Sequence, residues 1–277
     1  MAILRFFIYS NLFIAACAVL MVSQTYRLLL HIAPYPDLAA FIFFSAVCSY
    51  SFHWYLSPDS GTGSSRTKWQ KDNHYIHLVL FFTGFAGAVI FFLFLAKEWF
   101  WLLLAAVPTF LYSAPKIPNK YFRSLRKIAL GKTIFLALVW MYVTTILPFV
   151  VSHGKWQGDM YLFIISRFFM IYAISILFDY RDREEDKVKG IRSLITYFSE
   201  KGIRNLFIFS ILIFIISTSC LLFYHYSQFT VYVLLLPGII TALLYNYARR
   251  NFSDLLYYFI LDGLIALSPL LTLVTGI

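Results

Sequence analysis

The chain has 277 residues, of which 61% are hydrophobic and 13% charged, and its mean hydropathy is +0.75. Soluble domains are roughly 45–50% apolar and about 25% charged, so this composition excludes a soluble enzyme, a disordered chain and a disulfide-stapled secreted module. The composition also argues against a nucleic-acid partner, although the net charge is +10. In so apolar a chain, the surplus of Lys and Arg first reflects the orientation of the protein in the membrane.

Nine apolar segments are long enough, or nearly so, to cross a membrane, which takes about 20 residues. They predict an all-α, multi-pass integral membrane protein in which residues 1–277 form a single domain. The fourth segment is short and begins at a tryptophan cluster that is typical of an interfacial belt. In chain order the predicted spans are Phe6–Leu30, Pro36–Leu56, Ile76–Ala96, Trp99–Ser113, Thr133–Val151, Met160–Phe178, Asn205–Tyr226, Thr230–Tyr247 and Ser253–Ile277.

The Lys and Arg residues are distributed unevenly over the two sides of these nine spans. Nineteen fall on one side and three on the other, and Arg167 lies within the sixth span. Because cytoplasmic loops carry the excess of positive residues, we expect the N-terminus in the cytoplasm and the C-terminus outside. In a bacterium the location would be the inner membrane.

Three long loops face the predicted cytoplasmic side, namely residues 57–75, 114–132 and 179–204, and we expect them to cap the functional site. The second loop contains six basic residues and no acidic residue. Attraction to anionic lipids explains that bias. A wall that binds an anionic substrate group explains it as well.

The third loop begins with five of the chain's 13 acidic residues between Asp179 and Asp186. If the sixth helix continues to Gly190, then Asp179, Asp182 and Asp186 share an arc of about 60° at roughly 100° per residue. Such a face suits Mg²⁺, which takes one or two carboxylates together with substrate phosphates. A solvated face held by surface ion pairs is the alternative interpretation.

Two segments resemble motifs of the UbiA-type intramembrane prenyltransferases. Asp179-x-x-Asp182-x-x-x-Asp186, followed by Lys187–Leu194, resembles the second Asp-rich motif of that family. The segment Tyr112–Lys116 is similar to the family's stretch after the fourth helix. The resemblance implies a UbiA-like bundle of nine helices. It also implies transfer of an isoprenyl group from a prenyl diphosphate to a lipophilic or aromatic acceptor among membrane lipids.

The resemblance also implies a role for eight residues of this chain. Asp182 and Asp186 would be the catalytic Mg²⁺ ligands, with Asp179 as a further metal ligand. The remaining five would bind the diphosphate substrate: Tyr112, Lys116, Arg123, Lys189 and Arg192.

The first Asp-rich motif of the family, Asn-Asp-x-x-Asp-x-x-x-Asp, has no intact counterpart here. The matching stretch, Cys48–Asp59, contains one carboxylate. The three Asp positions fall either on Phe52, Tyr55 and Asp59 or on Tyr50, His53 and Ser57. His53 is then a ligand, a base or, in our preferred interpretation, a helix-packing residue. The missing motif keeps a second function open, that of a non-catalytic UbiA-like homologue with a lipid-binding or structural role.

Arg167 and Asp262 are the two charged residues expected deep within the membrane, where charges are costly and usually paired or functional. We expect each to pair with the other or with nearby polar groups. A role in an acceptor pocket or a proton route is the alternative. A transporter is disfavoured, because the sequence has no matched pair of helices broken by Gly or Pro.

Overall fold

The computed structural model describes the whole chain except residues 1, 58–63, 114–131 and 189–197. The described part is all-helical and contains no strand, which confirms the predicted fold class. The helices are α1 (Ala2–Tyr9), α2 (Leu12–Thr25) with η1 (Tyr26–Leu30), α3 (Pro36–Tyr55), α4 (Ser65–Asp72), α5 (His74–Phe94), η2 (Ala96–Glu98), α6 (Trp99–Ser113), α8 (Lys132–Met141) with η5 (Tyr142–Ile146) and α9 (Leu147–Val151), α10 (Gly158–Val188), α12 (Glu200–Ser219) with η6 (Cys220–Tyr224), α13 (Gln228–Ala248), and η7 (Leu256–Leu261) with α14 (Asp262–Thr275).

Eight helical segments of the described chain are long and apolar enough to cross a membrane, and the protein is a multi-pass membrane protein. They correspond to eight of the nine predicted spans. The predicted fourth span, Trp99–Ser113, is a helix of 15 residues with Pro108 inside it, which is shorter than the usual span. The count of nine spans and the orientation of the termini therefore stay predictions.

Three boundaries differ from the sequence-based ones. The first span begins at Leu12, because the chain breaks after α1 and Asn11 adopts a left-handed conformation with φ of 67°. The predicted loop 57–75 contains α4, whose start is capped by the Ser64 hydroxyl accepting from the Thr67 N–H at 3.2 Å. Helix α10 extends well beyond the predicted end of the sixth span, as the hypothesis of a continuous acidic helix requires.

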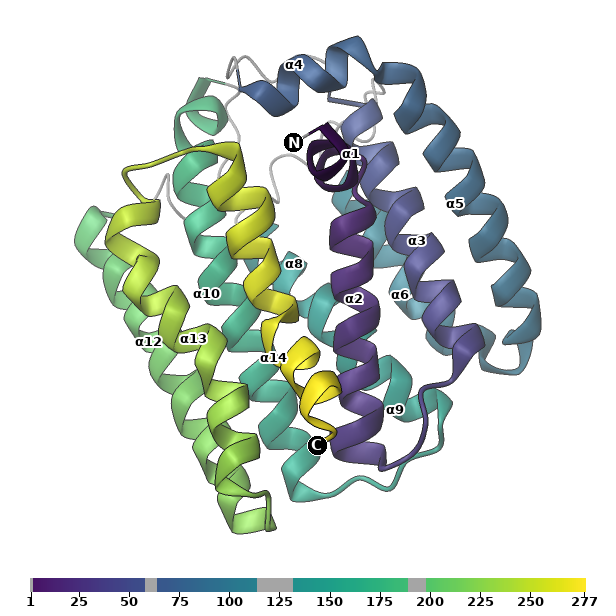
Figure 1. The fold of residues 1–277 in the computed structure, drawn as a ribbon, viewed down its shortest axis with the longest axis vertical. Coiled ribbons are helices and arrows are strands. Elements are labelled where there is room, and N and C mark those ends of the chain that lie inside the picture. The colour runs from purple at the N-terminus through teal and green to yellow at the C-terminus, as the bar shows by residue number, and fades with distance from the viewer. Residues whose placement is uncertain (1, 58–63, 114–131, 189–197) are drawn as a thin grey trace.

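The helices form one bundle, in which α2 and α14 pack side by side in the centre of the view (Figure 1). Helices α12 and α13 lie on one flank and α3 and α5 on the other. The short helix α4 lies across the upper end, close to α1, whereas the C-terminus lies toward the lower end. The upper end is therefore where α4 covers the interior of the bundle.

Helix α5 lies close to the backbone of α3 at Gly84. A Cβ added there would lie 2.6 Å from the backbone N of Cys48 and 2.9 Å from the carbonyl oxygen of Phe44. Small residues allow such close approach of membrane helices. We expect Gly84→Ala to lower the unfolding free energy by about 2 kcal/mol in an SDS titration, because backbone atoms cannot move aside as a side chain can.

Gly263→Ala is the matched control for that substitution, since its Cβ would meet only the Phe13 ring, at 3.4 Å. It should change the unfolding free energy by less than about 0.5 kcal/mol. Equal effects of the two substitutions would contradict a special role for the crossing at Gly84.

Candidate functional site

A cavity of about 1660 Å³ lies inside the bundle and is lined mostly by apolar and aromatic side chains. Its lining comes mainly from α2, α3, α5, α6, α8, α10 and α14, with further residues from α1, α4, η5, α9 and η7. Typical ligand pockets measure about 300–1,000 Å³, so this cavity can hold a ligand with a long apolar tail. Its charged residues include Arg66, Asp179, Arg181 and Asp182, which come from α4 and from the end of α10.

Two predicted carboxylates line this cavity from α10. Asp179 is buried and accepts a short hydrogen bond from the Thr133 hydroxyl at the start of α8. Asp182 follows three residues later and pairs with the Arg181 Nε at 3.1 Å, with 30% of its side chain exposed. Because α10 is continuous through this segment, the spacing of three residues places both carboxylates on one face, as predicted.

Other predicted site residues are not placed by the structure. Lys116, Arg123, Lys189 and Arg192 lie outside the described residues. Tyr112 and Asp186 lie within α6 and α10, but their side chains are also outside the described part. Their roles stay predictions.

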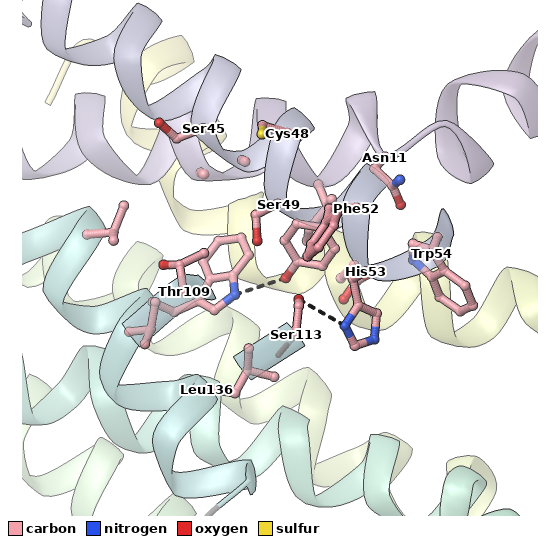
Figure 2. A pocket seen from close by; sticks show the side chains of 18 of the residues that line it. Asn11, Ser45, Cys48, Ser49, Phe52, His53, Trp54, Thr109, Ser113 and Leu136 are labelled. Atoms are coloured by element: carbon pink, nitrogen blue, oxygen red, sulfur yellow. Dashed lines mark hydrogen bonds between the residues drawn. The ribbon is translucent and has the colours of Figure 1, made fainter. Parts of the chain in front are cut away.

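The last two turns of α3 and the residues just after it form a second wall of the cavity. Ser49, Tyr50, His53 and Ser57 all line it. The His53 Nδ1 lies 3.2 Å from the Ser113 hydroxyl of α6, as expected of a histidine that joins two helices; Figure 2 shows this hydrogen bond as a dashed line. Tyr50, His53 and Ser57 of one register thus all line the cavity. Of the other register, Phe52 lines the cavity too, Tyr55 stacks on His74 with ring centroids 4.3 Å apart, and Asp59 lies outside the described residues. The choice between the two registers stays a prediction.

Arg66 is a buried arginine that also lines this cavity, and the sequence did not single it out. Arg66 of α4 places its guanidinium carbon 4.0 Å from the Trp54 ring centroid and 3.8 Å from that of Tyr258. Its Nη2 donates to the Asn11 Oδ1 at 2.7 Å, and its backbone N–H donates to Asp254 at 2.9 Å. Burial lowers the pKa of Arg66, although an arginine stays protonated in proteins.

Arg181 supplies a second guanidinium on the same aromatic ring. Its carbon lies 4.4 Å from the Tyr258 ring centroid, and its Nη2 makes a short hydrogen bond to the Tyr258 hydroxyl. Its Nη1 is buried without a hydrogen-bond partner among the described residues. The two guanidinium groups together with Asp182 can therefore hold an anion and a cation side by side.

The two mid-membrane charges do not pair with each other. The Arg167 Nη2 donates to the Gln24 Oε1 at 3.0 Å, and the Gln24 Nε2 in turn donates to the Thr272 hydroxyl at 2.9 Å. Arg167 is thus held by nearby polar groups, as one of the two expectations had it. Asp262 instead lines the cavity.

Asp179 and Asp182 suit one mode of Mg²⁺ binding, in which the protein supplies only part of the ligands. Within the described ranges no group of three or more His, Cys, Asp or Glu side chains converges on one point, so a cage made wholly of protein ligands does not arise there. Asp179 and Asp182 do offer the one or two carboxylates with which Mg²⁺ commonly binds while keeping water and phosphate oxygens. The donor set therefore suits Mg²⁺ carried by a phosphorylated substrate.

The fold is that of an intramembrane UbiA-type bundle. It matches the apo structure of a UbiA homologue from Aeropyrum pernix K1 with a TM-score of 0.66 over 97% of each chain, at 12% sequence identity. The model of the UbiA prenyltransferase family matches residues 70–255. The chain belongs to the UbiA prenyltransferase family, which confirms the resemblance seen in the sequence. No curated protein sequence matches it.

Proposed function

We propose that this chain is a prenyltransferase that binds a prenyl diphosphate with Mg²⁺ at the polar part of the cavity. The isoprenyl group would pass to a lipophilic or aromatic acceptor inside the membrane. Family membership suggests the reaction class. The observation that carries the proposal is the position of Asp182 and Arg181 on a large, mainly apolar cavity, because a prenyl diphosphate joins a charged head to a long apolar tail.

Each group has a distinct task in this proposal. Asp182, with Asp179 and the predicted Asp186, would hold Mg²⁺, which neutralises diphosphate charge when bound. Arg181 and Arg66 would face the diphosphate oxygens with fixed guanidinium groups that need no reorganisation as the leaving group departs. Predicted further contacts are those of Tyr112, Lys116, Arg123, Lys189 and Arg192.

The rest of the cavity would protect and accept the isoprenyl group. Its apolar lining excludes water that would otherwise capture a reactive allylic carbon. Aromatic rings such as those of Tyr50, Phe52 and Trp140 line it and would stabilise positive charge on that carbon.

Ligand-dependent stability of the purified protein tests the proposal. Geranylgeranyl diphosphate with Mg²⁺ at about 100 times its dissociation constant should raise the unfolding free energy by ~2.7 kcal/mol. The same ligand with EDTA, and geranylgeraniol with Mg²⁺, should raise it far less, because each lacks one half of the charged head.

A non-catalytic homologue is the second candidate function. The residues of α3 that line the cavity, such as Ser49, Tyr50 and His53, carry no carboxylate in the described segment, and this feature favours it. A non-catalytic role predicts that geranylgeraniol and geranylgeranyl diphosphate stabilise the protein equally, whether or not Mg²⁺ is present. That result would overturn the proposal of a prenyltransferase.

A further inference from the structure

Asp262 is a carboxylate in the last membrane helix to which the proposed reaction assigns no task. It begins α14 directly after the π-helical segment Leu256–Leu261, and it lines the cavity. Such π-helical segments occur often at functional sites. Within the described part of the chain, no hydrogen bond or ion pair reaches its carboxylate. A charged group at this depth is costly unless a partner compensates it, so an unpartnered carboxylate that faces a cavity points to a ligand.

The two guanidinium groups that also line the cavity have their described hydrogen bonds with other residues. Arg66 donates to Asn11 and stacks on Tyr258, and Arg181 bonds Asp182 and the Tyr258 hydroxyl. Among the described residues, neither guanidinium makes a hydrogen bond or an ion pair with Asp262. The oxygen lone pairs of Asp262 remain available to a hydrogen-bond donor in the cavity.

The helix position of Asp262 sets its depth relative to those arginines. Tyr258, Asp262 and Ile265 line the cavity at intervals of four and three residues, which puts them on one helical face. Asp262 therefore lies about one turn further along the helix than Tyr258. The guanidinium groups of Arg66 and Arg181 both lie over the Tyr258 ring. An anionic head held by the arginines would leave Asp262 facing the interior beyond it.

We propose that Asp262 binds a hydroxyl group of the acceptor substrate, so that the acceptor is a neutral, hydroxylated lipophile. The assignment of this ligand as the acceptor rests on the proposed prenyltransferase function. A carboxylate accepts a strong hydrogen bond from a hydroxyl group. It repels an acceptor that brings its own carboxylate. A neutral hydroxyl is also cheaper than an ammonium group to move into a cavity lined by residues such as Ile14, Val143 and Ile265.

A matched set of small probes tests this site without any prenyl diphosphate. 1-Naphthol, 1-methoxynaphthalene and 1-naphthoate share one ring system and differ in donating, lacking a donor or carrying a negative charge. Their dissociation constants would be measured on the full chain in lipid nanodiscs, with empty nanodiscs as the blank. The wild type should bind 1-naphthol at least about tenfold more tightly than either other probe, since hydrogen bonds to charged groups contribute about 1.5–3 kcal/mol.

Two variants separate the carboxylate from the shape of the pocket. Asp262→Leu should reduce the preference for 1-naphthol over 1-methoxynaphthalene to about onefold and should not impair folding, since it removes a costly charge from a membrane helix. Asp262→Asn should retain a smaller preference and weaken the rejection of 1-naphthoate. Asp37→Asn, a carboxylate at the start of α3 that does not line the cavity, should behave as the wild type.

Four results would overturn the inference. Three of them are a wild type that does not bind 1-naphthol, a wild type without preference among the probes, and an Asp262→Leu variant that keeps the preference. These results do not depend on whether the diphosphate binds with Mg²⁺, because the stabilisation experiment measures that binding separately. An ammonium site instead of a hydroxyl site would show as tighter binding of 1-naphthylmethylamine than of 1-naphthol, and this too would overturn the proposal.

Discussion

Replacing Arg66 by leucine is expected to lower the unfolding free energy by about 3 kcal/mol. The guanidinium lies over the rings of Trp54 and Tyr258, which meet each other edge to face, and each desolvated contact of this kind contributes about 1–2 kcal/mol. The substitution also leaves the buried Asn11 Oδ1 without its donor, which costs about 1–3 kcal/mol. Relief of the desolvated charge offsets part of these losses. The measurement is an SDS titration of the purified protein.

The control for Arg66 is its neighbour Lys68, which lies exposed on the same helix. Lys68→Leu should change the unfolding free energy by less than about 0.5 kcal/mol. Arg66→Lys should fall between the two, because lysine keeps the charge but has no planar group to lie over both rings. If Arg66→Leu unfolded at the same SDS concentration as the wild type, α4 would not be anchored to the bundle by this side chain.

Replacing Asp182 by asparagine is expected to weaken Mg²⁺-dependent binding of geranylgeranyl diphosphate at least about 100-fold. The substitution preserves shape and removes the negative charge that would hold the metal. Arg181 keeps its contacts with Tyr258, so the helix end should stay in place. Stabilisation by the diphosphate in the presence of Mg²⁺ would report the loss of binding, and transfer to an acceptor should fall in parallel.

Asp72→Asn provides the comparison for Asp182. Asp72 is an exposed carboxylate at the end of α4, and it does not line the cavity. Its loss changes the net charge by the same amount and should leave binding of the diphosphate unchanged. Equal weakening by Asp72→Asn would indicate a general effect of surface charge, and unchanged binding in Asp182→Asn would remove this residue from the metal site.

Arg66→Leu and Asp182→Asn test different properties of one site, namely its stability and its binding of ligand. Arg66 joins α4 to the chain around Asn11, to α3 and to η7, so its removal should disturb the polar part of the cavity as a whole. Asp182 makes its described polar contact with its own neighbour Arg181, so its removal should act on ligand binding far more than on folding. Parallel losses of stability in both variants would argue against this division.

The sequence by itself determined the features that depend on local periodicity and composition. The apolar segments predicted the membrane helices, because spanning the hydrocarbon core imposes a length and a hydropathy on each one. The spacing of Asp179 and Asp182 predicted a shared face, because the repeat of an α-helix is a property of the helix alone. The acidic block also carried the resemblance that the family match confirms.

Only the tertiary structure decided which distant residues meet in the site. In the sequence Arg66 is one of the 19 basic residues that the nine predicted spans place on one side of the membrane. Its partner Asn11 is 55 positions away, and the rings of Trp54 and Tyr258 come from two further elements. The sequence left open whether Asp262 pairs with Arg167. The structure instead binds Arg167 to Gln24 and directs Asp262 to the cavity. Such contacts between residues far apart in the sequence depend on how several helices pack against one another. The periodicity within a single helix carries no information about that packing.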